Sequence, residues 1–194
     1  MKHHHRLTAT LLLALACTAA SAQTPTPPPA PLQGDIAAHP TWPTAKPADV
    51  NSVDAILNAL YSVISGPKGH PRDWDRMRSL FLPSARLIPA RAAKDSPHAD
   101  ALILTIDDYI ARSSGTMTAS GFFERSIHNE VQQFGNIVHV WSTYESRHNA
   151  DDTTPFARGI NSIQLLKDGD RYWIINILWD SERPTNPIPA KYLP

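Results

Sequence analysis

The sequence has almost no cysteine, because Cys17 is the only one among its 194 residues. Cys17 lies in an N-terminal segment that we predict to be removed, so the mature chain would have no thiol for a disulfide or for thiol catalysis. The sequence also lacks a charge excess, with 18 basic and 18 acidic residues. A surface without surplus positive charge does not neutralise phosphate groups, so we expect no nucleic-acid partner.

Motifs for bound groups are absent from the sequence as well. It contains no phosphate loop, no dinucleotide fingerprint and no nucleophile elbow. His128, His139 and His148 lie on or beside the same predicted hairpin, but the pairing predicted below does not cluster them with carboxylates at metal-ligand geometry. We therefore expect no metal and no cofactor.

The N-terminus has the pattern of a cleavable signal peptide. Residues 1–6 are basic, residues 7–16 are apolar, and small residues lead up to Ala22. The apolar run is shorter than the about 20 residues that a membrane-spanning helix needs, so we expect cleavage after Ala22, export to the periplasm or beyond, and no membrane attachment afterwards. The alternative is a lipoprotein with a lipidated Cys17, although Ala14 stands where such signals usually carry Leu.

The rest of the chain divides into a spacer and one domain. Residues 23–49 are crowded with prolines and predict an extended, semi-rigid linker, or alternatively a proline-rich ligand for a partner. Residues 50–194 are long enough for a single domain with its own core.

Helical patterns come first in this domain. An apolar face over residues 53–64 predicts a long helix, residues 73–82 predict a second, and Thr105 with Asp108 predicts a capping box on a third. A short strand is expected at residues 85–88, and strand patterns separated by turns follow Gly121. This order predicts an α+β fold in which N-terminal helices pack on a curved antiparallel sheet that forms a cone with a pocket.

The last two strands form a predicted hairpin around Asp168-Gly169. A two-residue turn there pairs Asn161 with Asn176, Ile163 with Ile174 and Leu165 with Tyr172 on one apolar face. The opposite face is also largely apolar. Helices cover only one side, so the other would need the linker, the C-terminal tail or a second subunit, and we predict a homodimer.

The preceding hairpin turns at Gly135-Asn136 in this prediction. It pairs Glu124 with Arg147, His128 with Thr143 and Glu130 with Trp141 on one polar face, unless a β-bulge shifts the register. His128 and Glu130 are candidates for an acid–base pair, because imidazole and carboxylate groups exchange protons near neutral pH. The alternative is an ordinary solvated strand surface.

Several phrases of the sequence resemble the SnoaL-like, nuclear transport factor two-like superfamily over residues 50–182. They are Arg72-Asp73-Trp74, the run from Leu80 to Ala85, Phe134-Gly135-Asn136-Ile137, Arg158-Gly159-Ile160-Asn161-Ser162 and Asp170-Arg171-Tyr172-Trp173-Ile174. The resemblance implies a cone with a pocket between the first long helix and the sheet. Compared with ketosteroid isomerase, it places Tyr61 near the oxyanion-hole tyrosine and Asn161 near the acid that assists it. The general base would fall near Pro89, where this sequence has no carboxylate.

Three functions are consistent with these patterns. The first is an exported binding domain for a small, mostly apolar ligand, with anchors and wall residues Tyr61, Asn161, Asn176, Ile163, Ile174 and Tyr172. The second is an isomerase, dehydratase or cyclase that uses the same pocket, with His128 or Glu130 as proton carrier. The third is an interaction module of the cell envelope.

Overall fold

The computed structural model describes residues 29–32, 34–93 and 98–194. Contacts divide the chain into two units, Met1–Ala30 and Pro31–Pro194, and the second contains every helix and strand described below. The predicted signal peptide at residues 1–22 lies outside the described residues. Within the described ranges, none of the helices combines the length and the apolar composition needed to cross a membrane.

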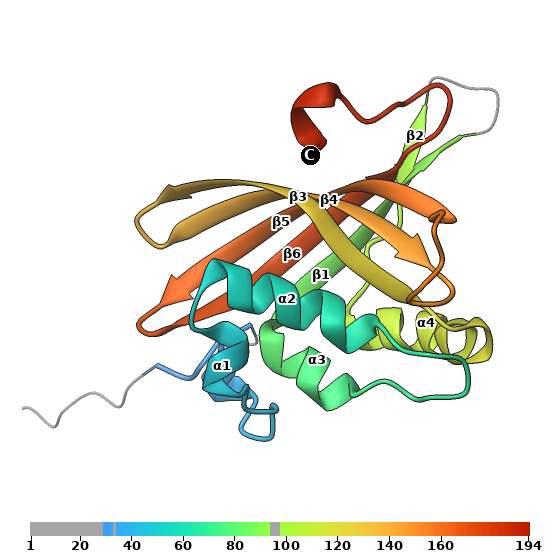
Figure 1. Cartoon of the computed structure of the whole chain (residues 1–194). Helices are drawn as coiled ribbons and strands as arrows, with labels where there is room; N and C mark the ends of the chain where they lie inside the picture. The colour runs from blue at the N-terminus through green and yellow to red at the C-terminus, as the bar shows by residue number, and fades with distance from the viewer. Residues whose placement is uncertain (1–28, 33, 94–97) are drawn as a thin grey trace, which may run out of the picture. The chain divides into compact units, whose positions relative to one another are not determined.

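Helices come first along the second unit, and four long strands follow one another after α4 (Figure 1). The helical elements are η1 (Ile36–Ala38), α1 (Pro47–Val50), α2 (Val53–Ile64), α3 (Trp74–Leu80), α4 (Ile106–Ser120) and η2 (Ala190–Tyr192). The strands are β1 (Phe81–Ala92), β2 (Ala99–Ala101), β3 (Phe123–Phe134), β4 (Ile137–Arg147), β5 (Ala157–Asp168) and β6 (Arg171–Ser181). They form one sheet in the order β2-β1-β6-β5-β4-β3, so the fold is α+β as predicted.

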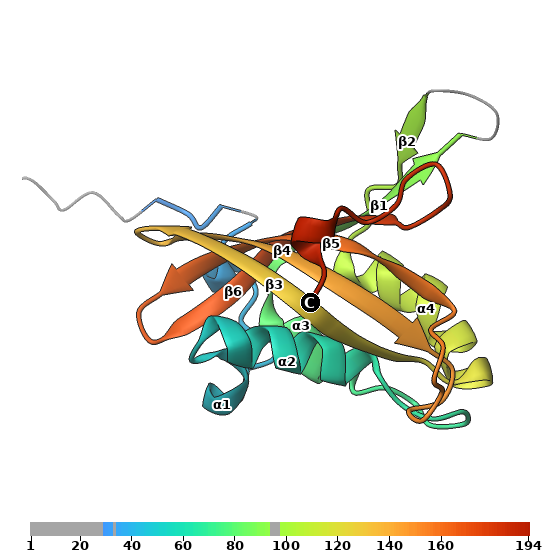
Figure 2. The ribbon, with the colours of Figure 1, turned by 45° about the horizontal axis from the view of Figure 1, so that its top comes forward.

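The two faces of the sheet have different covers. Figure 1 shows α2 and α3 beneath one face, with α4 beside them, and the C-terminal turn η2 across the other. We call these the inner and the outer face. Both views show β2 and the end of β1 projecting beyond the rest of the sheet (Figure 2).

The sheet is mixed rather than wholly antiparallel. Strands β3, β4, β5 and β6 pair antiparallel in sequence order, as predicted, but β1 pairs parallel to β6, with Arg86 opposite Asn176. β1 also begins directly after α3 and is longer than the predicted strand at 85–88. The sequence pattern missed this pairing because β1 and β6 are far apart in the chain and share no turn that fixes their direction.

The helices follow the predicted patterns closely. Ser52 caps α2 by accepting a hydrogen bond from the Ala55 amide at 3.0 Å, and the predicted apolar face is buried except for the half-buried Val53. The capping box of Thr105 and Asp108 at the start of α4 is confirmed. Side chains from the helices and the inner face of the sheet form one core, whose fully buried large members include Phe81, Ile56, Met77, Leu80, Ile163, Leu165 and Ile174.

The predicted register of the last hairpin is wrong. Asp168 faces Arg171, so the turn residues are Gly169 and Asp170, one position later than predicted. A second shift follows between Gln164 and Leu165. Together these shifts place Asn161 opposite Trp179 instead of Asn176.

The second shift is a bulge in β6, and it changes the face of Asn176. Leu165 pairs with Ile174, whereas Gln164 pairs with Asn176, so Ile175 has no partner across the strand. An extra residue reverses the in–out alternation beyond it. Ile174 and Ile177 therefore both point inward, and Asn176 lies on the outer face.

The packed domain begins within the predicted proline-rich linker. The indole nitrogen of Trp42 donates hydrogen bonds to the backbone oxygens of Arg78 and Phe81, each at 3.0 Å. Ala45 is buried in the core, and Pro47 starts α1. The boundary predicted at residue 50 thus moves toward the N-terminus.

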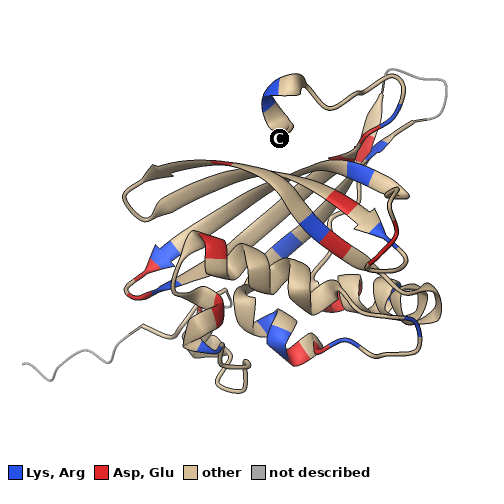
Figure 3. Ribbon diagram, in the orientation of Figure 1, with Lys and Arg blue, Asp and Glu red and all other residues tan. Residues whose placement is uncertain are grey.

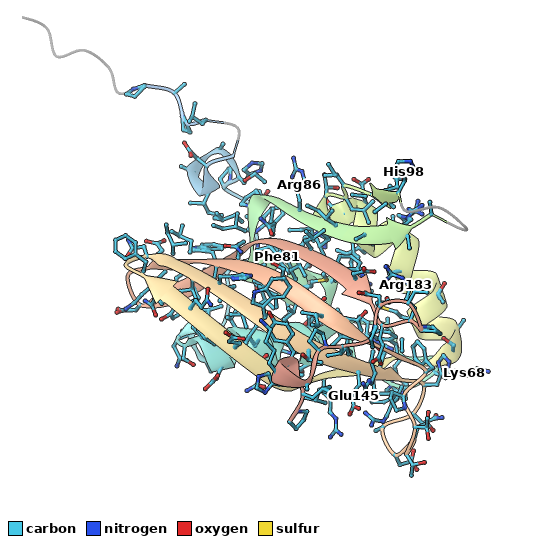
Figure 4. The ribbon with its side chains drawn as sticks, turned by 90° about the horizontal axis from the view of Figure 1, so that it is seen from above. Lys68, Phe81, Arg86, His98, Glu145 and Arg183 are labelled. Carbon is cyan, nitrogen blue, oxygen red and sulfur yellow. The ribbon has the colours of Figure 1, made fainter. Side chains whose placement is uncertain are left out.

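The C-terminal segment covers part of the outer face. The Thr143 hydroxyl donates to the Tyr192 carbonyl at 2.6 Å, and the rings of Trp141 and Tyr192 stack with centroids 5.7 Å apart. Seen from above, this segment crosses the sheet face on which Glu145 lies (Figure 4). Of the three covers that the sequence left open, the structure shows the C-terminal tail, and the homodimer stays a prediction.

Arg72 ties three parts of the inner layer together. Its buried guanidinium donates to the carbonyl oxygens of Ile64 at 2.9 Å, Gly66 at 2.6 Å, Met117 at 3.2 Å and His70. The end of α2, the following loop and α4 therefore share one buried cation. These carbonyls would lose a donor if the side chain were apolar.

We expect Arg72→Met to lower the free energy of unfolding by about 3 kcal/mol, because buried carbonyl groups would be left without partners. Urea unfolding monitored by tryptophan fluorescence measures the change. Arg112→Met, on the exposed side of α4, is the matched control and should change stability by less than about 0.5 kcal/mol. Equal effects of the two substitutions would contradict the role given to Arg72.

Candidate functional site

A cavity of about 220 Å³ lies between the inner face of the sheet and helices α2, α3 and α4. Aliphatic side chains from α2, α3, β1 and β6 form part of its wall, and Ser146 and Ala157 also line it. Six aromatic side chains line it as well: Tyr61, Tyr109, Phe122, Tyr144, Phe156 and Trp179. Glu124 and Asn161 are the most polar groups in this wall, so the site combines a large apolar surface with a small polar cluster.

Glu124 reaches the cavity because of a β-bulge in β3. The predicted register holds from Phe134 to His128, where His128 pairs with Thr143. Ile127 has no partner, and beyond it Glu124 pairs with Ser146 rather than with Arg147. The extra residue moves Glu124 from the predicted polar face to the inner face.

The carboxyl group of Glu124 is poorly solvated. The residue is half-buried because one side of it forms the cavity wall, while protein atoms surround the carboxyl group elsewhere. This desolvation raises the pKa of Glu124 to about 7, against the opposing effect of hydrogen bonds from Ser146 and Asn161. The Ser146 hydroxyl donates to Glu124 Oε2 at 2.7 Å. Glu124 can therefore gain or lose a proton near neutral pH.

Ser65 fixes Glu124 relative to α2. The Glu124 amide donates to Ser65 Oγ at 2.9 Å, and Ser65 Oγ donates to the Tyr61 carbonyl at 2.7 Å. Ser65 is also the residue that ends α2. One hydroxyl thus links the strand that carries the acid to the helix that carries Tyr61.

Three tyrosines surround the carboxyl group. Burial raises the pKa of Tyr61 and of Tyr109 well above the usual value, and raises that of Tyr144 to about 12. The negative charge of Glu124 contributes to all three increases. These hydroxyls therefore stay protonated throughout the pH range in which Glu124 titrates.

A directed hydrogen-bond chain begins at Asn161. Its Nδ2 donates to Tyr61 Oη at 3.1 Å, and Tyr61 Oη lies 2.6 Å from Ser142 Oγ. A phenol is a stronger acid than an alcohol, so the Tyr61 proton lies toward Ser142. Ser142 Oγ donates in turn to Ser126 Oγ at 3.2 Å, which donates to Asn129 Oδ1 at 2.7 Å. We call these five side chains the hydroxyl chain.

Gly159 makes room for Tyr144. A Cβ atom on Gly159 would lie 2.5 Å from the Tyr144 hydroxyl oxygen, which is too close for any side chain. Gly159 faces Tyr144 directly across β5 and β4. The glycine that precedes Ile160 and Asn161 in the sequence is therefore needed for the shape of the cavity.

Aromatic contacts frame the cavity wall. Phe156 is 51% exposed, stacks on the ring of His148 at 4.3 Å, and contacts Phe122 edge-on at 6.1 Å. Tyr109 and Trp179 meet edge-on at 6.4 Å. Since Phe156 both lines the cavity and faces solvent, it lies at the mouth.

Two of the six predicted ligand-binding residues line the cavity, namely Tyr61 and Asn161. Ile163 and Ile174 point inward but are fully buried in the core instead of lining the cavity. Tyr172 packs against the core and pairs with Lys167, and Asn176 lies on the outer face. The predicted pair of Asn161 and Asn176 does not form because of the turn position and the bulge in β6.

The predicted acid–base candidates lie away from the cavity. His128 and Glu130 pair with Thr143 and Trp141 on the outer face, beneath the C-terminal tail. The predicted pairing of these two residues is thus confirmed. Because their shared face is the outer one, their side chains do not reach the cavity. The sequence patterns do not identify Glu124 as a residue of the cavity. The one feature that could have indicated it is its place directly after two aromatic residues, Phe122 and Phe123.

No family model matches the sequence, and no curated protein resembles it. Similar solved structures include a cystatin-like protein of unknown function from Nostoc punctiforme, with a TM-score of 0.51, 9% identity, and coverage of 71% of this chain and 92% of that one. An NTF2-like protein of unknown function from Silicibacter pomeroyi is also similar, with a TM-score of 0.46, 13% identity, and coverage of 76% of this chain and 99% of that one. An NTF2-like protein of unknown function from Methylobacillus flagellatus has a TM-score of 0.43 and 17% identity, with coverage of 68% of this chain and 95% of that one. The similarity to the Nostoc punctiforme protein shows that this chain has a cystatin-like fold, in agreement with the α+β fold predicted from the sequence.

Proposed function

We propose that this domain binds a small, mostly apolar molecule in the cavity between the sheet and α2. The observation that carries the proposal is a predominantly apolar cavity whose wall holds one compact polar cluster, formed by Glu124, Asn161 and Tyr61. Small-molecule sites commonly have this composition, in which apolar surface supplies affinity and a few polar groups set orientation. Elsewhere, basic and acidic residues are interspersed along the helices and strands (Figure 3), which favours a small ligand over a polyanion.

A second candidate is an acid–base enzyme of the isomerase, dehydratase or cyclase type. The observation that favours it is the raised pKa of Glu124, about 7, because a proton carrier works best when its pKa is near the working pH. Glu124 replaces His128 and Glu130 in this role, since it alone of the three lines the cavity. An envelope interaction module is the third candidate, for which the partly covered outer face would be the surface.

The domain would act after export. The basic, apolar and small-residue segments within residues 1–22 support this proposal. Expression of the full sequence in a bacterium with a Sec system should yield a periplasmic protein whose N-terminal residue is Gln23, as measured by intact-mass spectrometry. A periplasmic chain cleaved before Cys17 and carrying lipid would support the lipoprotein alternative, and an uncleaved cytoplasmic chain would contradict export.

Filling the cavity should weaken ligand binding. We expect 2-phenylethanol, a small amphipathic probe, to bind the wild-type protein and shift the amide NMR signals of cavity residues. Ala157→Trp places a large side chain in the wall and should weaken binding at least ten-fold. Ala111→Trp, on the exposed side of α4, is the matched control and should bind as the wild type does. Signal shifts confined to residues away from the cavity would contradict the proposed site.

Glu124→Gln should flatten the dependence of stability on pH. The folded-state pKa of Glu124 is raised, so the group favours folding most below about pH 4.5, and this contribution is lost as pH rises toward about 7. Since each pKa unit corresponds to about 1.4 kcal/mol, the variant should gain up to about 3 kcal/mol over the wild type between pH 4.5 and 8. Urea unfolding at several pH values measures this difference.

The control for this experiment is Glu130→Gln on the outer face. It makes the same chemical change without touching the cavity. We expect it to leave the pH dependence of stability close to that of the wild type. If Glu124→Gln behaves in the same way, the carboxyl group of Glu124 is not desolvated in the folded protein.

A further inference from the structure

The cavity contains a negative charge without a counter-ion. Among the described residues that line it, Glu124 is the one carboxylate, and no lysine, arginine or histidine is present. The arginines nearest in its strand pair, Arg125 and Arg147, form ion pairs with Glu145 on the outer face at 2.6 and 2.5 Å. A desolvated charge that lacks a partner is unfavourable, so an ionised Glu124 would be stabilised by a cation that enters the cavity.

The hydrogen-bond donors of the polar cluster are already engaged. Nδ2 of Asn161 donates to Tyr61 and also faces the Glu124 carboxylate, which only accepts hydrogen bonds when ionised. The Tyr61 proton lies toward Ser142, and the Ser146 proton points to Glu124. What remains for a ligand is mainly acceptor capacity on the carboxylate.

The hydroxyl groups of the other two tyrosines near Glu124, Tyr144 and Tyr109, have hydrogen-bond partners as well. Tyr144 Oη lies 3.3 Å from Ser181 Oγ, and Tyr109 is hydrogen-bonded to Ser113. A carbonyl or an oxyanion would therefore find few free donors in this cavity and would meet the charge of Glu124. This arrangement differs from the oxyanion hole that the resemblance implied for Tyr61.

Aromatic rings complete the environment. Six of the lining side chains are aromatic, and the faces of such rings attract cations. A site that combines several aromatic rings with one carboxylate suits an alkylammonium group, because both kinds of group attract a positive charge. The aliphatic part of the wall then fits the remainder of the ligand.

We propose that the ligand is a small, mostly apolar amine that binds as its ammonium ion, with N–H groups donating to Glu124 and the aromatic rings around the charge. This inference rests on the proposed binding of a small molecule in the cavity and specifies its chemical class. It requires the carboxylate form of Glu124.

The affinity for an amine should consequently rise with pH. The groups that face Glu124 are Tyr61 from α2, Tyr109 from α4, Tyr144 from β4 and Asn161 from β5, and the three phenols keep their protons through neutral pH. Asp180 on β6 acts electrostatically on Tyr144, and His148 stacks on Phe156 at the mouth. The Glu124 carboxyl group itself changes charge between pH 5.5 and 8.5, whereas the groups in contact with it do not.

Three probes of similar size but different charge test the proposal: 2-phenylethylammonium, 2-phenylethanol and phenylacetate. Their dissociation constants for the purified protein are measured by calorimetry. At pH 8.5 we expect the ammonium to bind at least ten-fold more tightly than the alcohol, and phenylacetate to bind most weakly. At pH 5.5, where the ammonium is still charged but Glu124 is protonated, the preference over the alcohol should fall to about two-fold or less.

Two variants locate the effect. Glu124→Gln should remove the preference for the ammonium at both pH values while keeping the affinity for the alcohol. His148→Gln should keep the full pH dependence, because the imidazole lies at the mouth and not beside the carboxyl group. If either variant fails to fold, the pH profile of the wild-type protein still decides between a titrating acid and a neutral site.

The outcomes separate this inference from the proposed function. If the alcohol binds as tightly as the ammonium at pH 8.5, or if Glu124→Gln keeps the preference, the amine proposal is overturned while binding in the cavity stands. If none of the three probes binds and none shifts the signals of cavity residues, the proposed function itself is overturned. Tighter binding of phenylacetate would show that the cavity attracts anions and would also overturn the inference.

Discussion

The bulge at Ile127 determines which side chains of β3 reach the inside of the cone. Without it, Glu124 would face Arg147 on the outer side, and the cavity wall would contain only apolar groups, neutral amides and hydroxyls. One unpaired residue thus introduces a carboxyl group into an apolar site. It also brings Ser126 and Asn129 to the same side of the strand, where they complete the hydroxyl chain.

A desolvated carboxyl group requires a rigid environment to hold it. Ser146 and Asn161 give it hydrogen bonds, Ser65 fixes its backbone to α2, and Gly159 leaves space for Tyr144. Arg72 holds the end of α2 and α4 by backbone carbonyl groups. The local structure of three strands and two helices is therefore coupled to the electrostatics of one side chain.

The parts of the structure that local patterns specify could be predicted from the sequence. The apolar face of α2, the capping box of α4 and the pairing of His128 with Thr143 follow from spacing and turn chemistry within a few residues, and they are confirmed. The cavity positions of Tyr61 and Asn161 followed from the resemblance. These predictions succeed because each depends on contacts that are close in the chain or on a shared fold.

The failures have a common cause, which is that bulges and long-range pairings leave no local signature. A regular ladder in the predicted register places Asn176 on the inner face, and the bulge at Ile175 reverses that prediction. A regular ladder likewise places Glu124 on the outer face, and the bulge at Ile127 reverses that prediction. The parallel pairing of β1 with β6 depends on how the chain packs after the helices, and no turn motif reports it.

The tail contacts at Trp141 and Thr143 have a consequence for self-association. Tyr192 occupies the part of the outer surface that lies directly behind Ser142 and Tyr144, so a second molecule approaching that surface would meet the folded-back terminus before it met the sheet. Two copies would have to displace the last residues or pair through a different region. Because β4 carries the terminus on one side and part of the cavity wall on the other, a single strand separates the tail from the cavity.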